Sequence, residues 1–347
     1  MDARGDTHVL AVGTELPGPP LDNARLARRL GMDQMWQQWI DAFIGTRTRH
    51  LAVDLDTGER LHSLTDLAEA AGRRALTAAG VAPRDVELVV MGTASPDLLM
   101  PATVNLVADR LGIDGVPTYQ LQSGCAGAIQ ALDVARQLML ASGHRTALVI
   151  GGDSCAKHLD VHLDASKLPP AQLVNIVLFG DGAGAAVLTL DPVPGSVALR
   201  RVLNRLTGLG RPPGQSIEWF GAGELRDAPA DRLPASEDYK AIEESVPLMS
   251  AEILKELLDD LGWRRDDLHY LLPPQLSGRM TSQIVKHLDL PDAREVSCVA
   301  DTGNNGNALP FLQLERLLPR MASGERAIGI SVESSKWIKA GFALEKL

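Results

Sequence analysis

Short apolar runs alternate along this chain with longer stretches in which apolar residues recur at helical spacing. The short runs predict buried strands, and the longer stretches predict helices with one apolar face. The predicted strands are residues 86–91, 116–121, 147–151, 185–190, 269–272, 326–332 and 341–344. The predicted helices are residues 67–79, 104–111, 128–141, 248–261, 280–288 and 309–321. This alternation indicates an α/β fold with largely buried sheets.

Two stretches interrupt the alternation. Residues 200–237 are rich in Gly, Pro and Arg, which predicts a long surface excursion between two halves of similar layout. Residues 156–170 are irregular and contain His158 and His162, whose spacing would suit a metal site on a helix. Because no third ligand follows nearby, a solvated loop is the preferred interpretation and no metal is expected.

Composition narrows the classes of protein to consider. The 347 residues suffice for two packed domains or one large duplicated domain. A net charge of −10 argues against nucleic acid as a main partner, and no apolar run is long enough to span a membrane. The first residues lack the apolar core of a signal peptide, and three widely spaced cysteines suit a reducing compartment. A soluble, cytoplasmic protein is therefore expected.

The most informative of these cysteines is Cys125, which lies among small residues between the predicted strand 116–121 and the predicted helix 128–141. A tight strand-to-helix turn would direct backbone N–H groups and the positive end of a helix dipole at the sulfur. Such a position lowers the pKa of a thiol, and the same N–H groups can hold an oxyanion. The local pattern alone leaves a catalytic nucleophile and a buried, inert cysteine both open.

Two glycine-rich loops add candidate chemistry. Residues 179–184 lack the spacing of a dinucleotide-binding fingerprint and precede a predicted strand, so a tight turn in the core is preferred. Residues 301–307 form an Asn/Gly loop ahead of the predicted helix 309–321. This loop either caps the helix or places a carboxamide donor at a site.

Taken in order, these pieces resemble the β-ketoacyl-ACP synthase III family of the thiolase superfamily. The resemblance is carried by residues 39–50, 89–101, the turn at Cys125, and residues 147–153, 179–188 and 301–310. It implies a thiolase fold, which is a duplicated five-layer αβαβα arrangement. The N-terminal half, 1–190, would carry the nucleophilic cysteine, and the C-terminal half, 191–347, would carry the asparagine. The resemblance also implies a homodimer and a tunnel for a phosphopantetheine arm that ends at the cysteine.

The resemblance assigns the catalytic residues one by one. Cys125 matches the nucleophile that takes the acyl group as a thioester, and Asn304 matches an asparagine that stabilises an enolate. The histidine of the family is absent, because Pro274 stands in its place. Proline can neither polarise a carbonyl nor act as a base, and the loss of one such donor typically costs about 10²–10³ in rate.

Further departures from the family pattern concern the pocket. The family has a glycine-rich loop near its C-terminus that helps to build the oxyanion hole, and here that loop includes Ser335, Lys336 and Trp337. The two bulky side chains are expected to reshape the pocket. Met100 matches a residue that crosses the dimer interface and limits the length of the acyl chain.

The resemblance also assigns residues that bind pantetheine or the carrier. Trp39 matches an aromatic residue that stacks on the adenine of CoA, but Phe43 replaces the arginine on the other side, which weakens the case for CoA. Ser277 and Arg279 fall in the region that contacts the pantetheine arm or an acidic acyl carrier protein. Glu244 stands where the family has another basic residue that contacts the carrier protein. Docking of a carrier protein is therefore expected to differ from docking in the family.

These assignments favour an acyltransferase that moves an acyl group through Cys125, from a carrier protein or CoA to a second thiol, hydroxyl or amine. Transfer between thiols is nearly isoenergetic and needs less base assistance than decarboxylation, which fits Pro274. The resemblance to divergent members of the family implies a place in polyketide or other natural-product biosynthesis. Decarboxylative Claisen condensation is an alternative, with His269 the nearest histidine to the vacant position. A non-catalytic partner of an active ketosynthase is another, and a cysteine hydrolase is less favoured. No cofactor is expected beyond the acyl-phosphopantetheine or CoA substrate.

Overall fold

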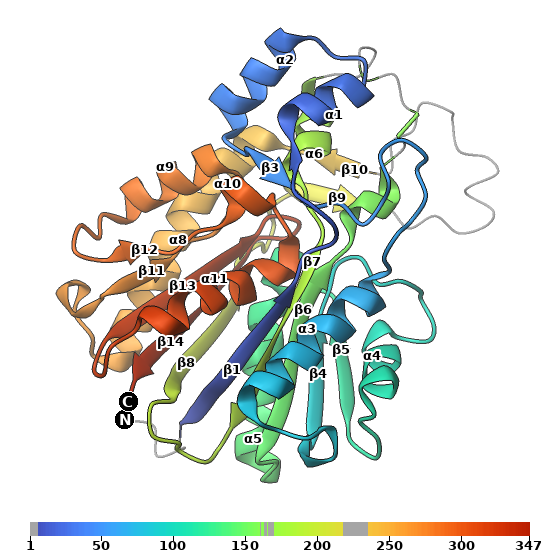
Figure 1. Ribbon diagram of the computed structural model, residues 1–347. Coiled ribbons are helices and arrows are strands. Elements are labelled where there is room, and N and C mark those ends of the chain that lie inside the picture. Colours follow the sequence, from blue (N-terminus) through green and yellow to red (C-terminus); the bar gives the residue numbers. More distant parts are fainter. Residues whose placement is uncertain (1–5, 160, 163–164, 166–169, 218–234) are drawn as a thin grey trace.

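The computed structural model describes residues 6–159, 161–162, 165, 170–217 and 235–347 (Figure 1). Ten strands form one sheet in the order β12-β11-β13-β14-β8-β1-β7-β6-β4-β5. The strands of its first half are β1 (Thr7–Glu15), β4 (Leu88–Gly92), β5 (Thr118–Leu121), β6 (Thr146–Asp153) and β7 (Gly182–Thr189). Those of the second half are β8 (Val197–Leu206), β11 (Tyr270–Leu272), β12 (Arg294–Glu295), β13 (Arg326–Glu333) and β14 (Ile338–Lys346).

The two halves of the sheet repeat one topology. The order β1-β7-β6-β4-β5 recurs as β8-β14-β13-β11-β12, with the same pattern of parallel and antiparallel pairs. The halves join where the start of β1 pairs with the start of β8. The connection between β7 and β8 contains residue 190, the predicted boundary between the N-terminal and C-terminal halves. The division into these two halves stays a prediction.

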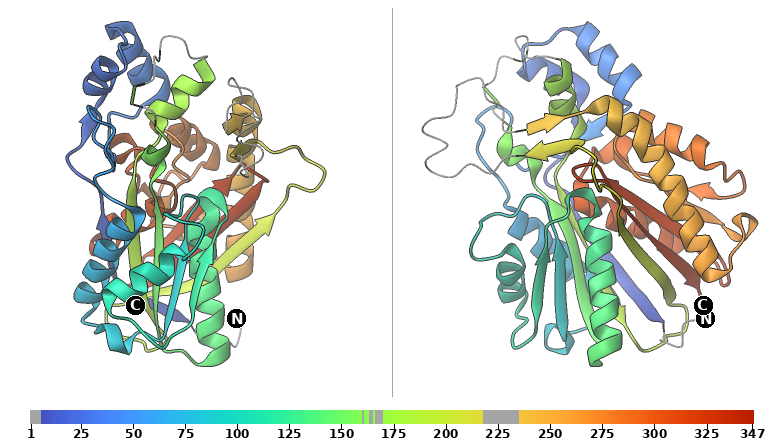
Figure 2. Two further views of the ribbon diagram at one scale, coloured as in Figure 1. Left: turned by 90° about the vertical axis from the view of Figure 1, so that its right-hand side faces the viewer. Right: turned by 180° about the vertical axis from the view of Figure 1, so that it is seen from behind.

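Helices complete the layers on both halves. The main ones are α3 (Leu64–Ala79), α4 (Thr103–Leu111), α5 (Gly127–Ser142), α8 (Tyr239–Leu261), α9 (Gly278–Leu288) and α11 (Leu309–Leu317). Helices α3 and α4 share one apolar cluster with the first half, and α8 and α9 share another with the second half. Between the halves, α5 and α11 contribute to the central core, which includes Leu132 and Phe311. This five-layer arrangement confirms the predicted thiolase fold, and Figure 2 shows it from two further directions.

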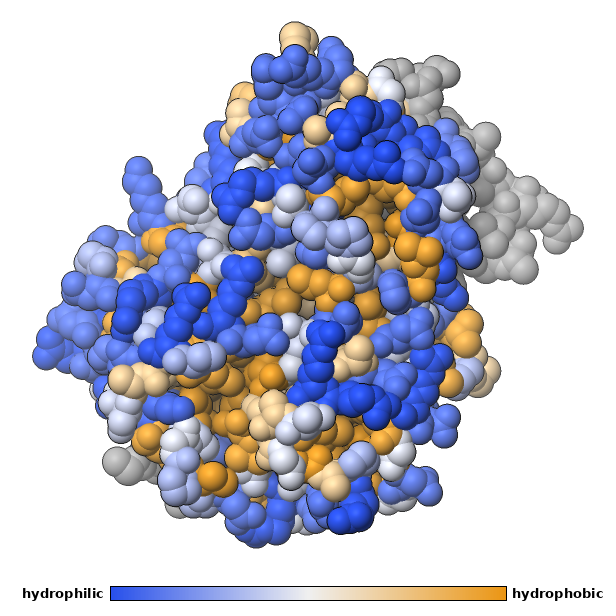
Figure 3. All heavy atoms as spheres, in the orientation of Figure 1, coloured by the Kyte–Doolittle hydropathy of each residue, from blue (hydrophilic) through white to orange (hydrophobic). Residues whose placement is uncertain are grey.

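Smaller elements surround the ends of the strands. They are α1 (Asn23–Arg29), α2 (Gln34–Trp39), a π-helix (Ile40–Ile44), α6 (Pro170–Leu178), α10 (Val299–Thr302) and the short pairs β2 (Leu21–Asp22) with β3 (Thr48–Arg49) and β9 (Gln215–Ile217) with β10 (Ala235–Glu237). Among them, α1, α2 and α6 share an apolar cluster of their own. On the face shown in Figure 3, apolar side chains reach the surface between the polar side chains.

The predicted strands and helices are all present, with small differences at most of their ends. The largest difference is at α8, which begins at Tyr239, nine residues before the predicted start at 248. The predicted excursion at 200–237 is wrong in its first part, because residues 200–206 belong to the buried strand β8. Residues 218–234 of that stretch lie outside the described residues, as do several positions within 156–170. Strand β1 is not singled out by the apolar pattern, because its apolar run 9–12 is short and has polar neighbours.

Candidate active site

Cys125 lies in a 3₁₀ turn (Gly124–Ala126) that connects the end of β5 to the first residue of α5. This position confirms the predicted strand–turn–helix arrangement. Gly124 has φ +50° in this turn, a conformation that residues with a side chain rarely adopt. The turn is fastened to the second half of the sheet, since Ser331 Oγ on β13 donates a hydrogen bond of 2.8 Å to the Cys125 carbonyl.

Asp153, at the end of β6, connects three segments beneath the cysteine turn. Its Oδ1 accepts hydrogen bonds from the Thr93 and Ser95 hydroxyls and from the Ala94 N–H, at 2.8–3.1 Å. Its Oδ2 accepts from both the backbone and side-chain nitrogens of Asn307, each at 2.8 Å. The side chain is 2% exposed, so all these donors depend on one buried carboxylate.

Asn307 in turn connects this hub to the helix that follows the cysteine. Its Oδ1 accepts a hydrogen bond of 2.7 Å from the Ala128 N–H, one of the otherwise unpaired donors in the first turn of α5. The Asn/Gly loop is therefore a helix cap, as one of its two interpretations predicts. The helix capped is α5, however, and not α11, which follows the loop in sequence.

Asn304, the second predicted catalytic residue, belongs to the same loop. Its backbone is held by hydrogen bonds with Leu178 and Gly180, and its Oδ1 accepts from the Gly306 N–H at 3.1 Å. The side-chain nitrogen donates no hydrogen bond to any residue that the structure describes, although the residue is 4% exposed. The carboxamide is thus oriented by its oxygen, which leaves its N–H groups available as donors.

The environment of the Cys125 thiol differs from the prediction. Burial raises the pKa of the thiol well above its ordinary value, and the negative charges of Glu333 and Asp153 raise it further. The prediction that the helix end lowers this pKa is therefore wrong for the free protein. The thiol is protonated at neutral pH and needs a base when it attacks a thioester.

Glu333, the last residue of β13, is the charged residue that contacts the cysteine turn. Its Oε2 accepts the Cys125 N–H, and its Oε1 accepts the Ser335 N–H at 2.6 Å. The side chain is 2% exposed. Glu333 is not among the residues predicted from the sequence, although a glutamate at the end of a largely apolar strand is a visible signal.

Pro274 is buried in the segment that follows β11, where its carbonyl accepts a hydrogen bond from the Thr281 hydroxyl at 3.2 Å. His269 precedes β11 and so lies at the other end of that strand from Pro274. Its Nδ1 accepts the Arg326 N–H at 3.2 Å. His269 is therefore positioned as a structural residue and does not replace the missing histidine.

The structure places the bulky residues after Glu333 against the segment that follows β8. The Trp337 indole donates 2.8 Å to the Pro212 carbonyl, lies beneath the Arg211 guanidinium and is 2% exposed. The Lys336 ammonium donates to the Arg211 carbonyl at 2.6 Å. Of the predicted pocket residues 335–337, only the Ser335 N–H shares a partner, Glu333, with the cysteine turn.

The predicted pantetheine and carrier residues partly converge. The Arg279 guanidinium lies 5.5 Å from the centre of the Phe43 ring, which is 54% exposed. Trp39 is half-buried four residues before Phe43 and packs on the apolar cluster of α1, α2 and α6. The Ser277 hydroxyl accepts the Met280 N–H at 3.1 Å and caps α9. Ser277 thus has a structural task, and Phe43 and Arg279 form one exposed pair.

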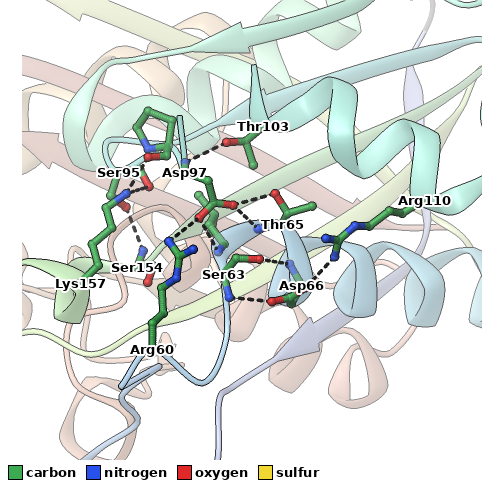
Figure 4. A network of polar contacts seen from close by, with 12 residues as sticks. Arg60, Ser63, Thr65, Asp66, Ser95, Asp97, Thr103, Arg110, Ser154 and Lys157 are labelled. Carbon is green, nitrogen blue, oxygen red and sulfur yellow. Dashed lines mark hydrogen bonds and ion pairs between the residues drawn. The ribbon is translucent and has the colours of Figure 1, made fainter. Parts of the chain in front are cut away.

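Met100 lies on a loop held by a polar network (Figure 4). The Asp97 carboxylate accepts hydrogen bonds from the Leu64 and Thr65 N–H groups at the start of α3. The Lys157 ammonium donates to the Ser95 and Pro96 carbonyls at 2.7 and 2.6 Å. This anchoring leaves three apolar side chains exposed on the described surface of the chain: Leu98, Leu99 and Met100.

The part of the chain that the structure describes contains no group of His, Cys, Asp and Glu residues suited to a metal ion. His162 instead lies 3.2 Å from an Arg29 nitrogen. None of the described helices combines the length and apolar character that a membrane span needs.

Comparison with known proteins identifies relatives of the chain. The 3-oxoacyl-[acyl-carrier-protein (ACP)] synthase III family matches residues 119–202, and the family's C-terminal region matches residues 258–333. The beta-ketoacyl-[acyl-carrier-protein] synthase III of Rhodospirillum centenum is 32% identical over 300 residues, or 86% of each chain.

Two solved structures resemble the chain over nearly its whole length. AbyA1, described as a tetronic acid condensing enzyme, is 64% identical, with a TM-score of 0.94 over 98% of this chain and 99% of AbyA1. The priming β-ketosynthase of the R1128 polyketide pathway is 27% identical, with a TM-score of 0.81 over 99% of this chain and 96% of its own. The sequence relatives, the duplicated fold and the cysteine at the start of α5 lead to one conclusion: the chain belongs to the ketosynthase III family of the thiolase superfamily.

Proposed function

We propose that this chain is a condensing enzyme that takes an acyl group onto Cys125 and joins it to a second thioester-bound chain to form a tetronic acid. The observation that carries the proposal is the 64% identity to AbyA1 over 98% of the chain. The acyl transfer predicted from the sequence leaves the acceptor open, and this proposal names it. The acyl group on Cys125 passes to a carbon of the second chain, and the acyl group on the carrier passes to a hydroxyl.

The chemistry of the product suits the residues present. A tetronic acid ring is a five-membered lactone, which an α-hydroxyacyl thioester and a β-ketoacyl thioester can form in two displacements. In the first, the α-carbon of the β-ketoacyl chain gives up a proton and attacks the Cys125 thioester, which releases the cysteine thiol. In the second, the hydroxyl attacks the remaining thioester, which closes the ring and releases the carrier thiol. Neither step loses CO₂, so the reaction needs no assistance to decarboxylation from the position that Pro274 occupies, although the α-carbon still has to give its proton to a base.

Cys125 and Asn304 have separate tasks in this scheme. Cys125 is the nucleophile that holds the hydroxyacyl group as a thioester. The Asn304 carboxamide, oriented through its oxygen, donates its N–H groups to the oxygen that gains negative charge as the enolate forms. Acyl-phosphopantetheine on a carrier, or acyl-CoA, supplies the substrate, and polyketide or related biosynthesis supplies the β-ketoacyl chain.

Decarboxylative condensation is the second candidate function. It is supported by the similarity to beta-ketoacyl-[acyl-carrier-protein] synthase III of Rhodospirillum centenum and by the presence of Asn304. Pro274 counts against it, because decarboxylation of a malonyl group draws on the proton donors of the site. The two functions differ in a simple readout, since only decarboxylation releases CO₂.

Intact-protein mass spectrometry tests the proposal through Cys125→Ala. The wild-type chain, incubated with hydroxyacyl and other acyl groups on carrier protein and on CoA, is expected to gain one acyl mass, and the variant none. Cys155→Ala is the matched control, because Cys155 is also a half-buried free cysteine and should leave the adduct unchanged. Adding a β-ketoacyl carrier should then discharge the adduct and yield a tetronic acid without CO₂.

Other outcomes would decide against the proposal. An adduct that survives in Cys125→Ala would remove the thioester role, and a β-ketoacyl product with CO₂ would establish the second candidate. If no donor acylates the wild-type chain, the proposed function fails and a non-catalytic partner of a ketosynthase becomes the better interpretation.

A separate prediction concerns the docking of the carrier protein, and the variant Arg279→Glu tests it. The Arg279 guanidinium beside the exposed Phe43 ring is a basic contact for an acidic carrier protein. Reversal of its charge is expected to raise the KM for carrier-bound donors roughly tenfold, with little change in kcat or in the KM for CoA-bound donors. Arg84→Glu, at another exposed arginine, makes the same charge change and should have no effect. An equal rise for both kinds of donor would contradict a docking role.

The homodimer implied by the family resemblance stays a prediction. The edge strand β5 and the exposed Leu98, Leu99 and Met100 are consistent with it.

A further inference from the structure

Glu333 occupies the place where an acyl-transfer site usually binds a developing oxyanion. Its two oxygens accept the Cys125 N–H and the Ser335 N–H. An N–H on the nucleophile itself, together with a second N–H from a neighbouring loop, is the usual composition of an oxyanion hole. Here that pair of donors holds a carboxylate of the chain itself.

Of the charged groups that act on the Cys125 thiol, Glu333 is the one whose carboxylate also accepts a hydrogen bond from this residue, at its backbone N–H. Asp153 acts through its charge, but five donors already saturate its oxygens. Burial raises the pKa of the neighbouring Cys155 thiol well above its ordinary value, so Cys155 is neutral near pH 7 and supplies no base. Pro274 and His269 provide no base at this position, as described above. The thiol is protonated, and the Glu333 carboxylate is bound to the backbone N–H of the same residue.

We propose that Glu333 is the catalytic acid–base residue of Cys125 and takes over proton transfer from the missing histidine. The inference rests on the proposed function, because it requires that Cys125 carries an acyl group. It adds a residue that neither the sequence pattern nor the family resemblance assigns.

The proton balance of the loading step is complete with these groups. As the sulfur bonds to the carbonyl carbon of the donor, the thiol proton moves to the Glu333 carboxylate. The neutral carboxyl no longer repels the new oxyanion and can donate its O–H toward it. When the tetrahedral intermediate collapses, the C–S bond to the carrier breaks, and the carrier thiolate receives the proton from Glu333. The products are acyl-Cys125, a carrier thiol and the original carboxylate.

The discharge of the acyl group uses the same residue. The Glu333 carboxylate accepts the proton from the α-carbon of the β-ketoacyl chain, and the carbon then attacks the Cys125 thioester. The cysteine leaves as a thiolate and recovers a proton from Glu333. Loading and discharge therefore each begin and end with the carboxylate ionised.

The test is Glu333→Gln, which keeps the shape of the side chain and removes its charge and basicity. Two rates are measured on the same protein: acylation of Cys125 followed by intact mass, and alkylation of Cys125 by iodoacetamide between pH 6 and 10, resolved by peptide mass. Acylation is expected to slow by about 10²-fold or more, because a general base is lost. Alkylation near pH 8 is expected to accelerate, roughly tenfold for each unit by which the thiol pKa falls.

The opposite signs of these two changes separate catalysis from structural damage. A disturbed turn would alter both rates without this divergence, whereas loss of a base beside the thiol slows acylation and speeds alkylation. Glu59→Gln, at an exposed glutamate, is the control and should change neither rate. If Glu333→Gln does not fold, Glu333→Asp retains the charge and should slow acylation while the thiol pKa stays high.

Failure of the inference is distinct from failure of the proposed function. If the wild-type chain acylates and Glu333→Gln acylates at the same rate, Glu333 has no catalytic role and the function stands. The inference also fails if the pH profile of Cys125 alkylation is the same in Glu333→Gln and in the wild-type chain, because Glu333 then does not act on the thiol. If the wild-type chain accepts no acyl group, the proposed function falls, and the role of Glu333 falls with it.

Discussion

Replacement of Asp153 with asparagine is expected to lower the free energy of unfolding by about 3–5 kcal/mol. The carboxylate accepts five hydrogen bonds in a site that is 2% exposed. An amide nitrogen in place of either oxygen would face the donors of Asn307 or the donors of residues 93–95. At least two buried donors would lose their acceptor, each at a cost of about 1–3 kcal/mol.

Urea unfolding at neutral pH measures this loss. Asp114→Asn is the matched control, because Asp114 is exposed, and the change should stay within about 0.5 kcal/mol. A loss below about 1 kcal/mol in Asp153→Asn would mean that the five donors do not depend on the carboxylate. The cysteine turn would then be positioned by the Ser331 and Glu333 contacts alone.

The fold could be predicted from the sequence because its signals are local. Apolar runs mark β4 to β7, β11, β13 and β14, and glycines mark the ends of α3, α4 and α5, where each adopts a left-handed conformation. The duplication is different, because it lies in the order of strands within the sheet and not in any repeated motif. Strand β8 is the longest strand that the apolar pattern did not predict, because its arginines made a partly buried strand resemble a loop.

The arginines of β8 show why that interpretation failed. Arg200 pairs with Glu345, and Arg201 pairs with Asp260, so each charge is satisfied by a partner far away in sequence. Local composition cannot reveal such partners. Apolar side chains hold the strand on both of its faces. The neighbouring residues Val202 and Leu203 point to opposite faces of the sheet and pack into two different cores.

The candidate site could be predicted only in part, for a similar reason. The turn at Cys125 has a local pattern, and the sequence indicates it directly. The thiol pKa is raised first by burial and then by the charges of Glu333, 208 residues away, and Asp153, and no local pattern contains these contributions. The sign of the prediction was wrong because it counted the helix end and neither the burial of the thiol nor these two carboxylates.

Replacement of Gly124 with alanine is expected to slow acylation of Cys125 by at least about 10²-fold. A Cβ at this position would overlap the Glu333 carboxylate, which contacts the adjacent Cys125 N–H. The turn or the carboxylate must then move, and a shift of about 1 Å at the reacting group can cost about 10²-fold in rate. Time-resolved intact-protein mass spectrometry with the best donor measures the effect.

The other end of the same helix provides the control. Gly143 ends α5 with φ +77°, and a Cβ there would meet nothing within 4 Å. Gly143→Ala therefore carries a comparable backbone cost of about 1 kcal/mol without any contact near the cysteine. If both variants acylate at the wild-type rate, the carboxylate does not lie where the structure places it. If Gly124→Ala alone is slow, the close approach of Glu333 to the turn governs the reactivity of Cys125.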